Sequence, residues 1–260
     1  TTWRSTLGRE IKSEGTSREQ MGAAIDAIGD VNGDGIDDLA IGAYRWDQSS
    51  SNSDQNNGAV FIWYGGDNRY SQDLVDEDGN ATNNPLLVSH NASNHTADVT
   101  ILGPSAGDSI GRSLSGAGDF DGDGNLDIIV GSEHAGSNAG MALIVNGSGT
   151  TIATFTGESA GDAAGRWVST IGDVNGDGFD DFWVGAPDSR TEKGYVQLYL
   201  GASTELSGEV APVATIIGAS DNDRFGDFIQ PLGDLNMDGY ADVAISATGD
   251  SNVGSVHVFY

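Results

Sequence analysis

The chain has 260 residues, of which 39 are acidic and 11 basic, so its formal net charge is −28. This balance argues against nucleic acid as a partner, because phosphate binding needs clustered basic side chains. The absence of cysteine excludes disulfides, thiolate zinc sites and cysteine catalysis. Abundant glycine, and no apolar run near the roughly 20 residues that cross a bilayer, favour a soluble chain of short strands and tight turns.

One acidic segment of nine residues recurs four times along the chain. The copies occupy residues 30–38, 119–127, 173–181 and 234–242. Eight residues before each copy stands a glycine, at Gly22, Gly111, Gly165 and Gly226. Twelve residues after the first Asp of each copy begins a turn of small residues, at Gly42, Gly131, Gly185 and Ser246. Four identical sets of spacings indicate internal repeats of one structural unit.

Short apolar stretches surround each acidic segment. The first follows the segment directly, at residues 39–41, 128–130, 182–184 and 243–245. A second lies at 58–64, 140–145, 194–200 and 254–260, and a third precedes the next glycine at 99–102, 151–155 and 213–217. Their length and their β-branched and aromatic content predict buried strands, about four in each repeat. The sequence therefore predicts an all-β fold, a β-propeller of four-stranded antiparallel blades.

We expect residues 1–260 to form a single propeller domain with repeats at approximately 14–65, 103–147, 157–201 and 218–260. Two polar insertions, 45–57 and 66–97, are expected in surface loops. The N-terminal segment resembles the last strand of a repeat, so residues 1–13 are expected to complete the last blade. Four visible blades fit either a closed four-blade ring or part of a larger propeller, for example one with seven blades.

The acidic segments have the spacing of calcium loops. Oxygen-bearing side chains at positions 1, 3, 5 and 9, with the backbone carbonyl at position 7, offer the hard ligands that calcium prefers. The glycine at position 6 permits the reversal that brings the two halves together. The expected ligands are Asp30, Asn32, Asp34, Ile36 and Asp38; Asp119, Asp121, Asp123, Asn125 and Asp127; Asp173, Asn175, Asp177, Phe179 and Asp181; and Asp234, Asn236, Asp238, Tyr240 and Asp242.

Two other interpretations of these segments carry less weight. An EF-hand needs a Glu at position 12, where this chain has only aliphatic residues. Asp, Asn and Gly also form plain turns, but thirteen carboxylates at the four ligand positions would repel one another without a cation. The second loop, with four carboxylates, is expected to bind most tightly. The fourth carries Met237 at position 4, which weakens the site if that position needs a left-handed backbone.

Taken together, the repeats resemble the FG-GAP repeats of integrin α-subunit propellers. The FG element is complete at Phe225 and Gly226, and the GAP element is complete at residues 185–187. The calcium loop between the two elements matches in all four copies. The resemblance implies about four structural calcium ions on one face of the propeller and a ligand-binding surface on the opposite face.

The function that the resemblance implies is that of an extracellular adhesion or ligand-binding module, which recognises a protein or glycan and is not an enzyme. We expect no membrane insertion by this chain. The alternative is an accessory or catalytic domain of a secreted carbohydrate-active or hydrolytic enzyme, since a fold does not dictate its function. The four histidines, however, form no metal-ligand or catalytic spacing.

Two features in or near the insertions suggest further sites. Residues 47–51 match the D-x-S-x-S pattern of a metal motif, although a flexible loop is the simpler interpretation. Tyr44, Trp46 and Tyr70 lie near the insertions and are candidates for an aromatic ligand-binding patch.

Overall fold

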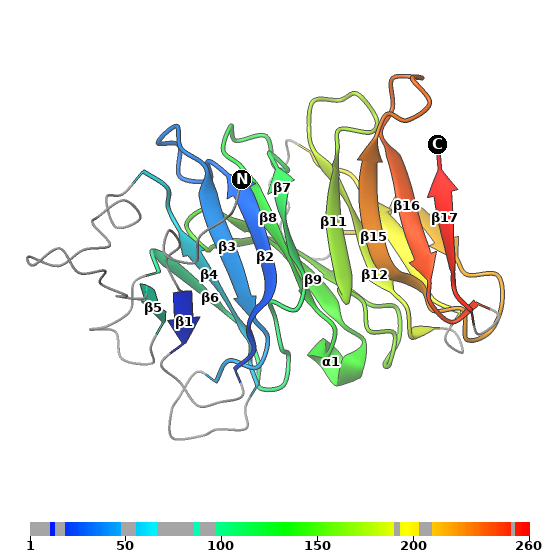
Figure 1. Ribbon diagram of the computed structural model, residues 1–260, viewed down its shortest axis with the longest axis horizontal. Coiled ribbons are helices and arrows are strands. Elements are labelled where there is room, and N and C mark those ends of the chain that lie inside the picture. Colours follow the sequence, from blue (N-terminus) through cyan, green and yellow to red (C-terminus); the bar gives the residue numbers. More distant parts are fainter. Residues whose placement is uncertain are drawn as a thin grey trace, which may run out of the picture.

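The computed structural model describes residues 11–13, 19–47, 56–66, 86–88, 97–189, 193–202, 210–250 and 253–260. The protein is all-β, and its antiparallel sheets are arranged as a four-blade β-propeller, which confirms the predicted fold class (Figure 1). One short helical segment, α1 (Ala135–Asn138), lies between strands of the second blade.

Each acidic segment joins the first and second strands of a blade. The first blade contains β2 (Met21–Gly29), β3 (Asp38–Ala43), β4 (Ala59–Trp63) and β6 (Val99–Leu102). The second contains β7 (Leu114–Gly118), β8 (Asp127–Ser132), β9 (Met141–Asn146) and β10 (Thr151–Thr156). The third contains β11 (Trp167–Gly172), β12 (Asp181–Ala186), β13 (Tyr195–Tyr199) and β14 (Ala214–Ile217). The fourth contains β15 (Phe225–Gly233), β16 (Asp242–Ala247) and β17 (Ser255–Phe259).

The first strand of each blade faces the centre of the molecule. The inner strands β2, β7, β11 and β15 contact one another in chain order, and the blades follow from blue to red across Figure 1. Residues of all four inner strands line one central cavity of about 570 Å³. The inner strands therefore surround the axis of the propeller.

The hydrophobic core lies between neighbouring blades. Aliphatic side chains such as Ile62 and Ile128 fill the space between the first and second blades. Between the second and third blades, Phe155 contacts Phe182 and Tyr199 with ring centroids 4.9 and 4.5 Å apart. Because these side chains are fully or almost fully buried, each blade depends on its neighbour for much of its stability.

Glycines allow the backbones of adjacent blades to approach closely. A Cβ atom added to Gly131 would lie 2.0 Å from the carbonyl oxygen of Gly165 in the next blade. The equivalent distances are 1.9 Å from Gly42 to the Gly111 oxygen and 2.2 Å from Gly185 to the Gly226 oxygen. No side chain fits in such a gap. At these three junctions the FG and GAP glycines are thus explained by direct contact between consecutive blades.

Only residues 11–13 of the N-terminal segment are described, so its expected role in completing the last blade stays a prediction. Its described part, β1 (Ile11–Ser13), pairs in parallel with β5 (Leu86–Val88) and not with β17. Among the described residues the fourth sheet has three strands, and Val256 and Val258 of β17 are 67% and 40% exposed. Most of the two insertions lies outside the described residues, so their surface location stays a prediction.

Candidate functional site

The four acidic loops lie at the same end of the propeller. Each follows the inner strand of its blade, and all four are at the upper end of the molecule in Figure 1. Their bounds agree with the predicted segments, since every second strand begins at the position-9 aspartate: Asp38, Asp127, Asp181 and Asp242.

The aspartate at position 1 organises the loop backbone. In the first loop Asp30 accepts hydrogen bonds from the N–H groups of Gly33 at 2.8 Å and Gly35 at 2.6 Å. In the third loop Asp173 accepts the equivalent bonds from the glycines at positions 4 and 6. Backbone hydrogen bonds, led by that from Gly178, lower the pKa of Asp173 and keep it ionised.

The aspartate at position 9 closes the loop from the strand side. Its Oδ2 atom accepts a hydrogen bond from the N–H group at position 2, with distances of 2.9, 3.1, 2.8 and 2.7 Å in loops one to four. All four of these carboxyl groups are buried at the start of a strand. Burial and neighbouring acids disfavour the charged form of a carboxyl group, so a nearby cation would stabilise it.

The second loop brings three carboxylates together. Oxygen atoms of Asp119, Asp121 and Asp127 all lie within 4.8 Å of one another, and no other such group of at least three acids, histidines or cysteines is found in the described part of the chain. Burial, followed by the charge of Asp121, raises the pKa of Asp127 to about 7. The Oδ1 atoms of Asp119 and Asp127 are buried without a hydrogen-bond partner. The donor set therefore fits a hard divalent cation such as calcium.

The other loops have the same ligand positions with one carboxylate fewer. Positions 1, 3 and 5 of loops one, three and four are half-buried or exposed, and position 3 is asparagine in each. In loop four, Met237 has a φ of 63° and is 90% exposed. The glycines at the same position of the other loops have φ angles of 78°, 74° and 77°. Position 4 does require a left-handed backbone, and Met237 is strained there.

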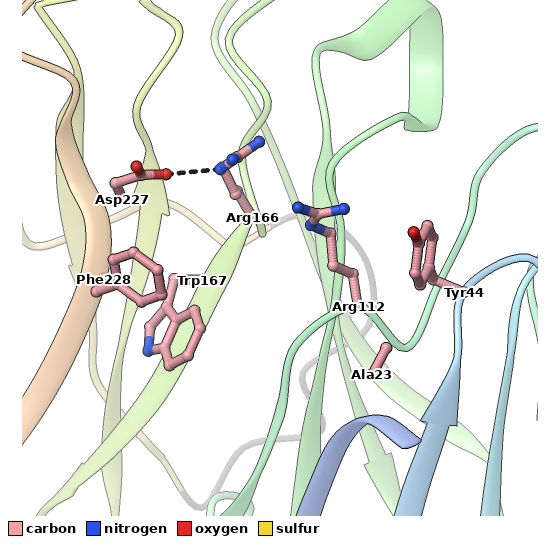
Figure 2. A pocket seen from close by; sticks show the side chains of 7 residues that line it. All are labelled: Ala23, Tyr44, Arg112, Arg166, Trp167, Asp227 and Phe228. Carbon is pink, nitrogen blue, oxygen red and sulfur yellow. Dashed lines mark hydrogen bonds and ion pairs between the residues drawn. The ribbon is translucent and has the colours of Figure 1, made fainter. Parts of the chain in front are cut away.

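A second feature lies at the opposite end of the inner strands. A cavity of about 260 Å³ opens there, lined by residues from all four repeats (Figure 2). It shares Ala23, Arg112 and Trp167 with the larger central cavity. Because the inner strands run from this cavity to the acidic loops, the two features lie on opposite faces of the propeller.

Ion pairs connect three blades at this cavity. The buried Glu133 forms an ion pair with Arg112, with Nε 3.0 Å from Oε1, and accepts a hydrogen bond from Arg166 Nη1 at 2.9 Å. Arg166 Nε also donates to Asp227 at 2.6 Å. Burial opposes the charge of Arg166, but the hydrogen bond to Asp227 and the nearby acids raise its pKa, so it stays a cation.

These cavity residues were not found from the sequence. Arg112, Arg166, Trp167, Asp227 and Phe228 follow the repeat glycines by one or two residues, at positions that differ from copy to copy. One feature of the sequence does indicate them: the repeat is otherwise regular, but the side chains immediately after each glycine differ between the copies.

The suggested aromatic patch was wrong in part. Trp46 is 4% exposed and packs against Phe61 with ring centroids 4.9 Å apart, so it belongs to the core. Tyr44 instead lines the cavity of about 260 Å³, and Tyr70 lies outside the described residues. Asp47 is buried and accepts a hydrogen bond from the Asn56 N–H group at 2.7 Å; residues 48–51 of the suggested metal motif lie outside the described residues.

Comparison with known sequence families identifies the repeats. Residues 21–63 and 230–259 match the FG-GAP repeat, and residues 119–184 match the FG-GAP-like repeat. The chain therefore belongs to the FG-GAP repeat proteins, and over about half its length it is a distant homologue of integrin α subunits.

Three relatives illustrate the homology. Integrin alpha-8 of Gallus gallus is 35% identical over 64% of this chain, integrin alpha-V of Gallus gallus 35% over 55%, and integrin alpha-PS2 of Drosophila melanogaster 32% over 55%. The chain spans only 16, 14 and 11% of the length of these relatives.

A chain in the crystal structure of the V. cholerae biofilm matrix protein Bap1 aligns with 75% of this chain and 42% of its own length. That alignment has 18% identity and a TM-score of 0.21, values too low to support a conclusion about fold or function. In the described part of the chain, no helix has the length and apolar character needed to span a bilayer.

Proposed function

We propose that this propeller is a calcium-stabilised module that binds a protein or glycan ligand outside the cell, without catalysis. The cluster of three aspartate carboxylates in the second loop is the observation that carries the proposal. Three aspartates converge within 4.8 Å, and two buried oxygen atoms among them have no hydrogen-bond donor. Such an arrangement supplies oxygen ligands and leaves negative charge that only a cation or a proton can balance.

The proposal extends to the other three loops by their shared geometry. The position-9 bond to the position-2 N–H group recurs in all four, and the position-1 bond to the position-6 glycine recurs at 2.6, 3.1, 2.8 and 2.9 Å. We propose that the side chains at positions 1, 3, 5 and 9 and the carbonyl at position 7 of each loop bind one ion, which gives about four ions. When bound, calcium supplies positive charge that neutralises the carboxylates and links the two halves of the loop.

The magnitude of this stabilisation is large for a domain. An ion that binds only the folded state adds about 1.4 kcal/mol at a tenfold excess over its dissociation constant. Four such ions add about 6 kcal/mol, which approaches the roughly 5–15 kcal/mol of net stability of a typical domain. Calcium outside cells would therefore maintain a rigid propeller.

The ligand is proposed to bind the face opposite the loops. That face carries the cavity of about 260 Å³ with its arginine and aromatic side chains, residue types that contribute strongly to binding surfaces. Homology to integrin α subunits supports both an extracellular location and a role in recognition.

Thermal melting of chelator-treated protein, with and without calcium, tests the metal part of the proposal. We expect calcium to raise the melting temperature by about 10 °C or more. Asp127→Asn should remove part of this rise, because it removes the buried ligand of the second loop. Asp121→Asn is the matched control, since the other three loops have asparagine at this position; it should lose less. An unchanged melting curve on calcium addition would refute the proposal.

A further inference from the structure

The cavity of about 260 Å³ at the end of the inner strands, called the axial cavity below, is built from equivalent positions of the four repeats. The residue directly after each repeat glycine reaches it: Ala23, Arg112, Arg166 and Asp227 (Figure 2). In a symmetric propeller these positions have the same backbone setting. The chemistry of the cavity is therefore set by the side chains that differ between the blades.

Basic side chains gather at this cavity although the chain is strongly acidic. Of the four arginines that the structure describes, Arg112 and Arg166 line the cavity and Arg45 lies beside it. The guanidinium carbons of Arg45 and Arg112 lie 5.5 and 5.3 Å from the ring centroid of Tyr44. Both contacts are within the range of cation–π attraction.

The acids at the cavity are already paired, whereas part of each guanidinium is not. Glu133 forms ion pairs with both arginines, and Asp227 accepts hydrogen bonds from Arg166 and from the hydroxyl group of Thr248, the latter at 2.7 Å. Among the residues that the structure describes, Arg112 pairs with an acid only through its Nε atom, so both of its Nη atoms are unused there, and Arg166 has an unused Nη2 atom. Since the unused groups are donors, the cavity favours an anion over a cation.

Aromatic rings form the rest of the wall. Trp167 and Phe228 lie with their ring centroids 4.7 Å apart, and Phe228 is 51% exposed. The indole N–H of Trp167 donates to the Ile229 carbonyl oxygen at 2.7 Å, which fixes the orientation of the ring. A few placed polar groups beside such apolar surface are typical of a small-molecule site.

The charge of the whole protein limits the kind of anion. A net charge of −28 repels a polyanion at long range. A ligand with a single carboxylate on an otherwise neutral body carries only one negative charge and so avoids most of this repulsion. Its carboxylate can contact the arginine donors while its body contacts the aromatic rings. Planar guanidinium groups also match carboxylate geometry well.

We propose that the axial cavity binds a ligand group that bears one carboxylate on a ring body, with Arg112 and Arg166 holding the carboxylate and Trp167 and Phe228 contacting the ring. This inference deepens the proposed ligand-binding function and rests on it. The carboxylate belongs either to an acidic sugar unit or to an aromatic amino acid, and the experiment separates these sources.

Calcium-saturated protein is titrated with two acids and their neutral counterparts, and binding is followed by ligand-observed NMR. The acids are glucuronate and N-acetylphenylalanine; the counterparts are glucose and N-acetylphenylalanine amide. We expect at least one acid to bind with a dissociation constant on the order of 1 mM, as for small ligands, and about tenfold more tightly than its counterpart. The acid that binds identifies the source.

Variants connect binding to the cavity. Arg112→Gln should weaken binding of the acid about tenfold, the loss expected for a charge-assisted hydrogen bond. Lys193→Gln is the control, because it removes the same charge from a surface residue that pairs with Asp221 at 3.6 Å; it should bind like the original protein. Arg112→Lys keeps the charge but loses the planar guanidinium that can bind both carboxylate oxygens, so this variant should bind with intermediate affinity.

Three results would overturn the inference: neither acid binds, acid and counterpart bind equally, or Arg112→Gln and Arg112→Lys both bind like the original protein. The calcium-dependent melting curve of each variant shows that it is folded. If calcium stabilises the original protein but neither acid binds to it, this inference alone is rejected. If calcium does not stabilise the original protein, the proposed function is rejected instead.

Discussion

Met237 occupies a backbone position that glycine occupies in the other three loops. Its φ of 63° places a side chain in the left-handed region, where a non-glycine residue costs roughly 1 kcal/mol. The side chain is 90% exposed, so packing does not offset this cost. The strain belongs to the backbone alone.

Met237→Gly should therefore stabilise the protein by about 1 kcal/mol and raise its melting temperature by about 2–4 °C. Gly176→Met, the reverse change in the third loop, should destabilise it by a similar amount. A Cβ atom at Gly176 meets no atom within 4 Å, so only the backbone is tested. Calorimetric melting measures both variants, and equal melting temperatures for Met237→Gly and the original protein would argue against strain.

The raised pKa of Asp127 predicts how calcium binding depends on pH. Burial raises this pKa to about 7 in the folded protein without metal, against 3.8 for a free aspartate. The folded state then binds an additional proton between these pH values, so this contribution to stability is lost as the pH rises towards 7. Calcium requires the ionised form, so its affinity should change in the opposite direction.

We expect the affinity of the tightest calcium site to fall up to about tenfold per pH unit below pH 7. Titration calorimetry at pH 5.5, 6.5 and 7.5, in two buffers with different ionisation enthalpies, measures both the affinity and the proton released. A pH-independent affinity with no proton release would contradict the assignment of Asp127 as a protonated buried ligand.

At the scale of elements, contact between blades explains the repeat glycines. Gly131 in β8 faces the Gly165 carbonyl oxygen of the next blade, and an added Cβ atom would lie 2.0 Å from it. Ser246 in β16 holds the equivalent position in the fourth blade, where its hydroxyl group accepts a hydrogen bond from the Phe228 N–H group at 3.0 Å. Serine is thus accommodated in the fourth blade but not in the second.

Gly131→Ser should destabilise the protein by about 3 kcal/mol, because the backbones of two blades must separate. Ser246→Gly should cost less than about 1 kcal/mol, the value of one hydrogen bond and some chain entropy. Denaturant unfolding compares the two variants. Similar losses from both would show that close approach of the blades is not what selects glycine.

The sequence predicted the elements better than it predicted their side-chain partners. Strands and acidic loops were predictable because hydrophobic content, glycine position and acid spacing repeat with the blade. Arg112 and Arg166 were missed because their function depends on Glu133 and Asp227, which are distant in sequence and become neighbours only in the fold. Trp46 was misassigned because its burial depends on contact with Phe61 of another strand.

At the scale of the molecule, acid charge and metal loops are two parts of one arrangement. The loops hold thirteen of the 39 acidic residues at ligand positions. Four divalent ions would change the formal net charge from −28 to about −20, and would do so where the carboxylates are closest. Without calcium, monovalent salt screens this repulsion only in part, because the position-9 aspartates are buried.

Calcium titration of chelator-stripped protein by isothermal titration calorimetry tests the central claim most directly. The proposed loops predict about four bound ions for each chain, with the second loop filled first because it has four carboxylates. Asp127→Asn should remove the tightest site and leave the others. Absence of calcium binding, or a stoichiometry that Asp127→Asn does not change, would contradict the account.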